Sequence, residues 1–146
     1  MMSKFSNQYA NVFYDAEIDA ISLVFKNVSP LEEFIHINQK VLDIFKTLQT
    51  NRFYVDTRKI GVVSPEGQKW VIENLFSGMV KHIKHERLYH VQVLPQNEIF
   101  GKFAAENIKR RSQTMYQSDE LIIEAFENET LAKNWLTHQP KLKSAH

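Results

Sequence analysis

Apolar and polar stretches alternate along the chain in a way that predicts an antiparallel pair of strands near its start. The apolar segments 9–14 and 20–26 are joined across 15–19, a polar stretch of hairpin length. Within the second segment, residues 21–25 are almost continuously apolar. Such a strand is typically buried on both faces, so we expect it in the interior of a sheet.

A helix is predicted after this hairpin, from Ser29 to about Gln49. Apolar residues recur there at helical spacing, at Leu31, Phe34, Ile35, Leu42, Phe45 and Leu48. Ser29 is expected to cap the helix, Pro30 to occupy its first position and Glu32 to complete a capping box. The pattern therefore places the change from strand to helix at Ser29.

The rest of the chain continues this alternation of strands and helices. Ser64 and Pro65 open a second helix with a wide apolar face, which Gly78 interrupts at a cost of about 1 kcal/mol relative to alanine. Further strands are predicted at 53–55, 88–94 and 121–126, and further helices at 97–111 and from Asn128 to Leu136.

The predicted element order is β-β-α-β-α-β-α-β-α, and strands that alternate with helices imply crossovers between parallel strands. We therefore expect an α/β fold with a mixed, mostly parallel five-stranded sheet, an N-terminal β-hairpin and four helices. One domain is expected over residues 9–136. The polar segments 1–8 and 137–146 are expected to be flexible termini.

The composition narrows the class of protein. The 146 residues carry a formal net charge of +1, which gives no global attraction to nucleic acid. The absence of cysteine excludes disulfides, thiolate zinc sites and thiol catalysis. No apolar run approaches the roughly 18 residues of a membrane span, and the first residues lack the apolar core of a secretory signal. We expect a soluble, cytoplasmic protein that binds no nucleic acid.

Candidate chemistry gathers where the third predicted strand ends. Asp56, Thr57 and Arg58 follow a short apolar stretch, and Ser64 starts the next helix. Binding crevices of α/β domains lie outside the carboxyl ends of strands, and a helix amino end favours an anion. These residues, with Lys59, are our candidate site for an anionic group or a partner protein. The alternative is structural: Asp56 caps the loop, Thr57 bonds locally and Arg58 pairs with a surface acid.

Two further clusters carry ionisable side chains. His82, His85 and His90 lie close in sequence, but no carboxylate is obviously placed as a further ligand, so no metal or cofactor is expected. Basic residues in 81–87 and 109–111 fall at predicted helix ends, where positive charge suits the helix dipole. The alternative is a basic surface for an acidic partner or a lipid headgroup.

Large apolar side chains of the second and third helices are candidates for a ligand pocket. Trp70, Phe76, Met79, Phe100 and Phe103 could line a cavity between the helices and the sheet. Their spacing is equally explained by burial of the two helices in the core. A cavity surrounded by these residues would distinguish the two interpretations.

The chain resembles the SpoIIAA-like group of the STAS superfamily over about residues 9–136. The resemblance rests on the element order, on 53–58, on Ser64-Pro65-Glu66 with Trp70 behind it, and on 132–136. It implies a small α/β fold, and related folds bind lipid-like molecules or protein partners. In the antagonist branch the third strand ends in Asp-Ser, and phosphorylation of that serine switches partner binding. Asp56-Thr57 stands at the equivalent place, which makes Thr57 a candidate phosphorylation site, although Arg58-Lys59 follow here in place of a small turn.

Our leading hypothesis is a non-enzymatic regulatory or protein-interaction domain that binds a partner through residues 56–66. The alternative is a carrier that holds a small lipid-like or apolar ligand between helices and sheet. An enzyme is disfavoured, because no paired acid and base, activated nucleophile or Gly-rich phosphate loop is found in the sequence. The edge of the N-terminal hairpin makes a homodimer a further expectation, since edge strands tend to pair.

Overall fold

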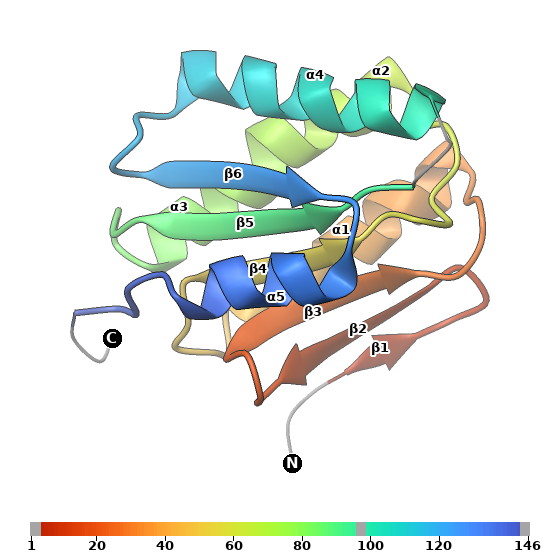
Figure 1. Ribbon diagram of the computed structural model, residues 1–146. Coiled ribbons are helices and arrows are strands. Elements are labelled where there is room, and N and C mark those ends of the chain that lie inside the picture. Colours follow the sequence, from red (N-terminus) through yellow and green to blue (C-terminus); the bar gives the residue numbers. More distant parts are fainter. Residues whose placement is uncertain (1–3, 96–98, 144–146) are drawn as a thin grey trace.

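The computed structural model describes residues 4–95 and 99–143, which form an α/β fold around one mixed sheet (Figure 1). The strands lie in the sheet in the order of the sequence. They are β1 (Phe5–Ser6), β2 (Ala10–Asp15), β3 (Ala20–Phe25), β4 (Arg52–Asp56), β5 (Leu88–Val93) and β6 (Leu121–Phe126). β1, β2 and β3 pair antiparallel, and β3 to β6 pair parallel. The expected α/β class with a mixed sheet is confirmed.

The expected number of five strands is wrong, because the sheet has six. The additional strand, β1, lies within the segment 1–8 that was expected to be flexible, and its Phe5 pairs with Val12 of β2. The Phe5 ring also makes an edge contact with the His36 ring, at a centroid distance of 5.6 Å. Two residues are too few for a periodic signal in the sequence, so contacts made after folding define this strand.

Four helical segments cover the sheet. They are α1 (Leu31–Phe45), the continuous segment α2 (Pro65–Trp70), η1 (Val71–Phe76) and α3 (Ser77–His82), then α4 (Ile99–Met115) and α5 (Glu129–Thr137). Crossovers between successive parallel strands have one handedness, which puts the first three segments on one face of the sheet, the helical face. α5 packs on the opposite face, the α5 face (Figure 1). Within the ranges described, no helix combines the length and hydropathy needed to cross a membrane.

The alternation of side chains along β4 divides the core between these two faces. Phe53 and Val55 belong to the larger apolar cluster, which lies under α1, η1 and α3. Tyr54 belongs to the smaller cluster on the α5 face, together with Ala132 and Leu136 of α5. Since successive strand residues point to opposite faces, Asp56 follows Tyr54 to the α5 face.

The start of α1 differs from the expected capping box. Pro30 is the N-cap residue, with an extended backbone (ψ 159°) and no side-chain cap, so the helix begins at Leu31 and not before it. A proline ring offers no hydrogen-bond acceptor to the first turn. Glu32 and Glu33 lie in that turn instead, where their negative charge suits the positive end of the helix dipole.

Gly78 lets α3 approach α1 closely. A Cβ atom built on Gly78 would lie 2.7 Å from both Cδ atoms of Leu42 in α1, and Leu42 is itself buried. Any side chain at this position would therefore displace Leu42. The helix tolerates the unfavourable propensity of glycine here because the two helices pack at this point.

Replacing Gly78 by alanine is expected to lower the free energy of unfolding by about 1 kcal/mol, since overpacking outweighs the gain in helix propensity. In a Leu42→Ala background, where the space is open, the same change is expected to raise it by about 1 kcal/mol. Urea unfolding of the four proteins of this double-mutant cycle measures the difference. Equal effects of Gly78→Ala in both backgrounds would contradict the close-approach account.

Arg52 fastens the segment that follows α5 to the amino end of the parallel strands. Its side chain is buried, and it donates hydrogen bonds to the backbone oxygens of Ile18 (2.8 Å), Thr137 (3.3 Å) and Gln139 (2.8 Å). Asn51 adds a bond from its side-chain amide to the Pro140 oxygen (3.1 Å). Part of the segment expected to be a flexible C-terminus is therefore bound to the body of the domain.

Candidate functional site

Asp56 and Arg58 form a closed pair at the carboxyl end of β4. The Arg58 guanidinium donates Nε to Asp56 Oδ1 (3.0 Å) and Nη2 to Oδ2 (2.6 Å), which is a bidentate contact. The Arg58 backbone N–H donates to Asp56 Oδ1 as well (3.0 Å), so the carboxylate also holds the turn. The hydrogen bond from Arg58 to the Asp56 side chain raises the pKa of Arg58 further above its usual value. This geometry is close to the structural alternative, in which Asp56 caps the loop.

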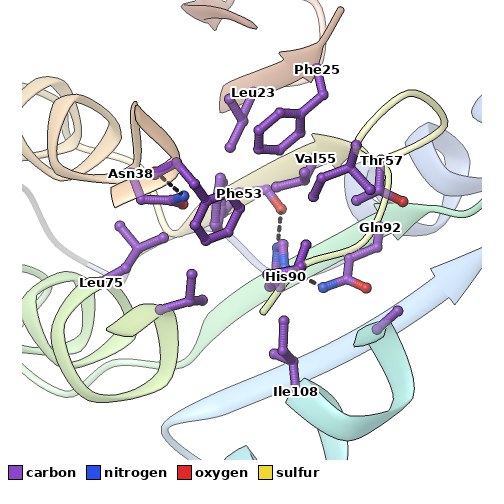
Figure 2. Close-up of a pocket in the computed structure, with 15 residues that line it drawn as sticks. Leu23, Phe25, Asn38, Phe53, Val55, Thr57, Leu75, His90, Gln92 and Ile108 are labelled. Atoms are coloured by element: carbon purple, nitrogen blue, oxygen red, sulfur yellow. Dashed lines mark hydrogen bonds between the residues drawn. The ribbon is translucent and has the colours of Figure 1, made fainter. Parts of the chain in front are cut away.

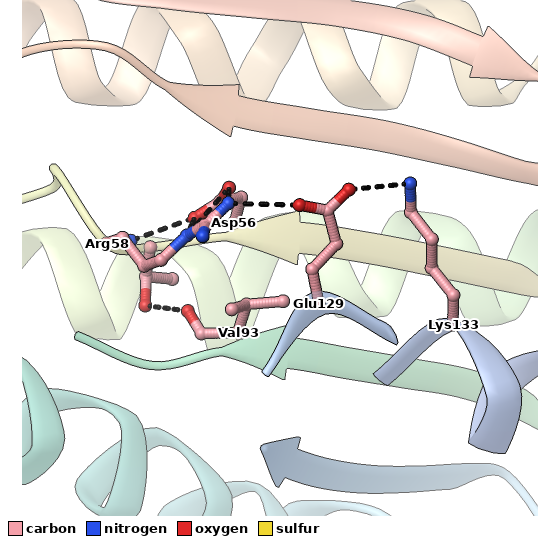
Figure 3. Close-up of polar contacts among 6 residues, drawn as sticks. Asp56, Arg58, Val93, Glu129 and Lys133 are labelled. Atoms are coloured by element: carbon pink, nitrogen blue, oxygen red, sulfur yellow. Dashed lines mark hydrogen bonds and ion pairs between the residues drawn. The ribbon is translucent and has the colours of Figure 1, made fainter. Parts of the chain in front are cut away.

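The pair continues into α5 (Figure 3). Arg58 Nη2 lies 3.2 Å from Glu129 Oε2, and Glu129 Oε1 accepts a bond from Lys133 Nζ at 3.0 Å. Lys133 and then Arg58 hold the pKa of the Glu129 carboxyl below its usual value. Two carboxylates and two cations thus balance one another. Arg58 is engaged on the α5 face, and this leaves it poorly placed to receive a further anion.

Thr57 turns to the other side of the sheet. Its hydroxyl is buried and donates to the Val93 backbone oxygen at 2.6 Å, and its own N–H donates to the same oxygen at 3.0 Å. Both bonds extend the pairing of β4 and β5 by one residue. Phosphorylation of Thr57 would require this hydroxyl to leave its partner and reach solvent.

Ser64 is the N-cap of α2, as its sequence context predicts. Its hydroxyl accepts the Gly67 N–H at 3.1 Å. Because α2 belongs to the helical face while Asp56 joins α5 on the opposite face, the structure does not bring Ser64 and the Asp56 carboxylate together. Lys59 lies between them on the exposed part of the loop.

The loop between β4 and α2 has an apolar outer surface. A surface hollow of about 70 Å³, here called the loop groove, lies between this loop and the start of α1; its walls are Ser29, Leu31, Phe34, Ile60, Val62, Val63 and Ser64. Val62 is 65% exposed at its rim, and the neighbouring Val28 is 61% exposed. Gly61 has a left-handed backbone (φ +74°), and a Cβ there would lie 2.6 Å from Val28 Cγ2. This contact fixes the two loops against each other.

The five residues proposed from the sequence to line an apolar pocket do not surround one. Phe76 and Met79 are fully buried core residues, and Trp70 packs against the same core. Phe103 is largely exposed on α4. The side chain of Phe100 lies outside the described residues. For Trp70, Phe76 and Met79, helix burial explains the spacing.

A different set of residues encloses a cavity of about 50 Å³ under the helical face, here called the core cavity (Figure 2). Its walls come from β3, β4, β5, α1, η1, α4 and the loop after β4; they are Leu23, Phe25, Phe34, Asn38, Phe53, Val55, Thr57, Ile60, Val63, Val71, Leu75, His90, Gln92, Ala105 and Ile108. Most of the lining is apolar. None of these residues except His90 can carry a charge.

His90 and Gln92 form a buried polar pair in the wall of the core cavity. Burial lowers the pKa of His90 to about 4, so the ring is neutral at pH 7. His90 Nδ1 lies 3.0 Å from the Phe53 backbone oxygen, which can only accept, so this nitrogen carries the proton. His90 Nε2 must then accept, and Gln92 donates to it from Nε2 at 3.1 Å. The remaining amide atom, Gln92 Oε1, is buried and makes no hydrogen bond among the described residues.

This pair was missed as a site, although the sequence carries a signal for it. His90 and Gln92 alternate with Tyr89, Val91 and Val93, so the pattern indicates a strand with one polar face. The strand is central and buried on both faces. Two polar residues on the buried face of a central strand are a sign of an internal polar site.

The other histidines considered for a metal are separate from His90. His82 Nε2 lies 2.8 Å from the Leu48 backbone oxygen, and His85 Nδ1 lies 3.0 Å from Glu120 Oε2. Within residues 4–95 and 99–143, no group of three histidine or acidic side chains is placed to hold a metal ion.

Comparisons with protein-family models, with curated proteins and with solved structures find no match to this chain.

Proposed function

We propose that the chain is a non-enzymatic protein-interaction domain of the SpoIIAA/STAS-like kind, and that its partner binds at the loop groove. The observation that carries this proposal is the clustering of exposed aliphatic side chains at one place. Val28 and Val62 are more than half exposed, and Leu31, at 38%, lies beside them. Exposed apolar side chains gathered around a hollow are typical of protein-binding surfaces.

The charges around the groove indicate the chemistry of the partner. Glu32, Glu33 and Glu66 lie in the first turns of α1 and α2, which flank the groove, and Lys59 is the neighbouring cation. Arg58, which the sequence suggested for an acidic partner, is held by Asp56 and Glu129. The partner we propose is therefore a polypeptide segment with an aliphatic or aromatic side chain flanked by lysine or arginine.

The alternative of a lipid carrier has weaker support. Pockets for drug-sized ligands usually measure roughly 300–1,000 Å³. The core cavity, at about 50 Å³, is far smaller than an acyl chain requires. An interaction surface agrees better with these dimensions.

A displayed library of random peptides tests the proposal. Peptides selected on the wild-type protein are expected to combine an apolar residue with basic neighbours. Val62→Glu is expected to weaken a selected peptide at least about 10-fold in fluorescence polarisation, because burying one apolar side chain contributes about 1.5–3 kcal/mol. Glu66→Lys is expected to weaken it as well, through charge repulsion.

Leu131→Glu is the matched control, because Leu131 is an exposed aliphatic residue of α5 on the opposite face. It is expected to leave the affinity unchanged. Selection of acidic peptides, or equal effects of Val62→Glu and Leu131→Glu, would refute the loop groove as the binding surface.

A further inference from the structure

The core cavity offers hydrogen-bond acceptors to whatever occupies it. Gln92 lines the cavity, and the bond to His90 forces its amide nitrogen toward the ring, so Oε1 is turned away from that bond (Figure 2). Gln92 is only 5% exposed, and this oxygen makes no hydrogen bond among the described residues. The Thr57 hydroxyl also lines the cavity and spends its proton on Val93, which leaves it able to accept. Leaving a buried acceptor such as Oε1 unsatisfied costs free energy, so the site favours a hydrogen-bond donor.

The remaining walls define the size and charge of a suitable occupant. They are mostly apolar and carry no charged group at neutral pH, so a charged ligand would lose its hydration without compensation. A cavity of about 50 Å³ is smaller than the roughly 150 Å³ cavity that holds a benzene molecule. An occupant of about four heavy atoms is therefore the upper size for this space.

We infer that the core cavity is a binding site for a small neutral molecule with one hydrogen-bond donor and a short apolar body, of the class of the short-chain alcohols. The donor bonds Gln92 Oε1, and the apolar part contacts Val55, Leu75 and Ile108. A site of this kind accepts an alcohol and rejects the ketone of the same shape, because a ketone oxygen would face the Gln92 oxygen.

The cavity also shares a wall with the loop groove, which gives the ligand a route to the surface. Phe34, Ile60 and Val63 line both spaces. A ligand that fills the cavity fixes the inner side of these residues and so acts on Val62 between them. This second step rests on the proposed function, because it makes the ligand a regulator of partner binding at the groove.

The experiment compares 2-propanol with acetone, which have the same heavy-atom skeleton and differ in the donor. Both are titrated into the ¹³C,¹⁵N-labelled full chain, and the methyl signals of Val55, Leu75 and Ile108 are followed by NMR. We expect saturable shifts with 2-propanol in the millimolar range, since a ligand of about four heavy atoms binds no tighter than tens of micromolar. Acetone is expected to bind at least about 10-fold more weakly. Absence of saturation, or equal affinity for the two molecules, would overturn the site.

Two variants locate the binding. Ala105→Val adds volume to the cavity wall and is expected to abolish the saturable shifts, whereas Ala125→Val, the same substitution at an exposed position of β6, is expected to leave them unchanged. Gln92→Met removes the acceptor and is expected to abolish the preference for 2-propanol over acetone. If Gln92→Met does not fold, Ala105→Val alone decides: binding of 2-propanol that survives this substitution refutes the assignment to the cavity.

The regulatory step has its own readouts. Saturating 2-propanol is expected to shift the backbone amides of Ile60 to Val63 and to change the affinity of a groove-selected peptide at least about 3-fold, in wild type but not in Ala105→Val. Unchanged amides and unchanged peptide affinity, with 2-propanol bound, would refute the coupling. Failure of peptide selection would refute the proposed function, while the alcohol titration still decides the cavity site.

Discussion

Replacing Arg52 by methionine is expected to lower the free energy of unfolding by about 3 kcal/mol, because the backbone oxygens of Ile18, Thr137 and Gln139 lose a charged donor. Methionine keeps much of the side-chain volume, so the effect reports the hydrogen bonds more than the packing. Part of the penalty is relieved where the freed carbonyls reach water. Urea denaturation at pH 7 measures the loss.

The control for this change is Arg110→Met, at an exposed arginine of α4. It is expected to alter the free energy of unfolding by less than about 0.5 kcal/mol. Amide hydrogen exchange adds a local test: in Arg52→Met, the residues after α5 are expected to lose protection before the sheet does. A variant within 1 kcal/mol of wild type, with that segment still protected, would show that Arg52 does not fasten it.

Acidification is expected to destabilise the domain through His90. The pKa of this buried ring falls from 6.5 to about 4 on folding. Between these values the unfolded chain binds a proton that the folded chain does not, so the free energy of unfolding decreases as the pH falls. At about 1.4 kcal/mol per unit of pKa difference, the full loss is about 3 kcal/mol. The stabilisation is fully present above about pH 6.5 and is lost as the pH approaches 4.

The measurement is the free energy of unfolding in urea at several pH values from 7 to 4.5. His90→Gln is the matched variant, because glutamine is neutral throughout and can still donate to the Phe53 oxygen. The slope between pH 6.5 and 5 is expected to be much smaller in His90→Gln than in wild type. Equal slopes would mean that another group accounts for the pH dependence.

The element order of the fold was predictable because the apolar pattern alone encodes it. Each strand of the parallel part was expected near its observed place, and Ser64 was identified as a helix cap. β1 was missed, because a strand of two residues exists only through its pairing with β2. The start of α1 was also misplaced, since the backbone angles of Pro30, and not its identity, decide whether it is the N-cap or the first helical residue.

The candidate site was predictable only in its local part. A carboxylate two residues before an arginine can bond the intervening turn, and Asp56 and Arg58 do so. Glu129, which completes the cluster, lies 71 residues from Arg58, and no local pattern connects the two. Alternation along β4 also sends the Asp56 side chain to the α5 face, whereas Ser64 caps a helix of the helical face. Proximity in sequence therefore suggested a shared rim that the two faces of the sheet divide.

The placement of α5 has a consequence for synthesis of the chain. Tyr54, Tyr89, Val91 and Val93 are apolar residues of central strands that α5 alone covers within the described ranges, and α5 follows all six strands in the sequence. While the ribosome is still translating residues 129–137, the nascent sheet can already assemble but exposes this face to the cytosolic or chaperone environment. At about 5–20 residues per second, that interval lasts on the order of a second, plus the time for the helix to leave the exit tunnel. Premature association of nascent chains would therefore begin at the bare side of β4 and β5.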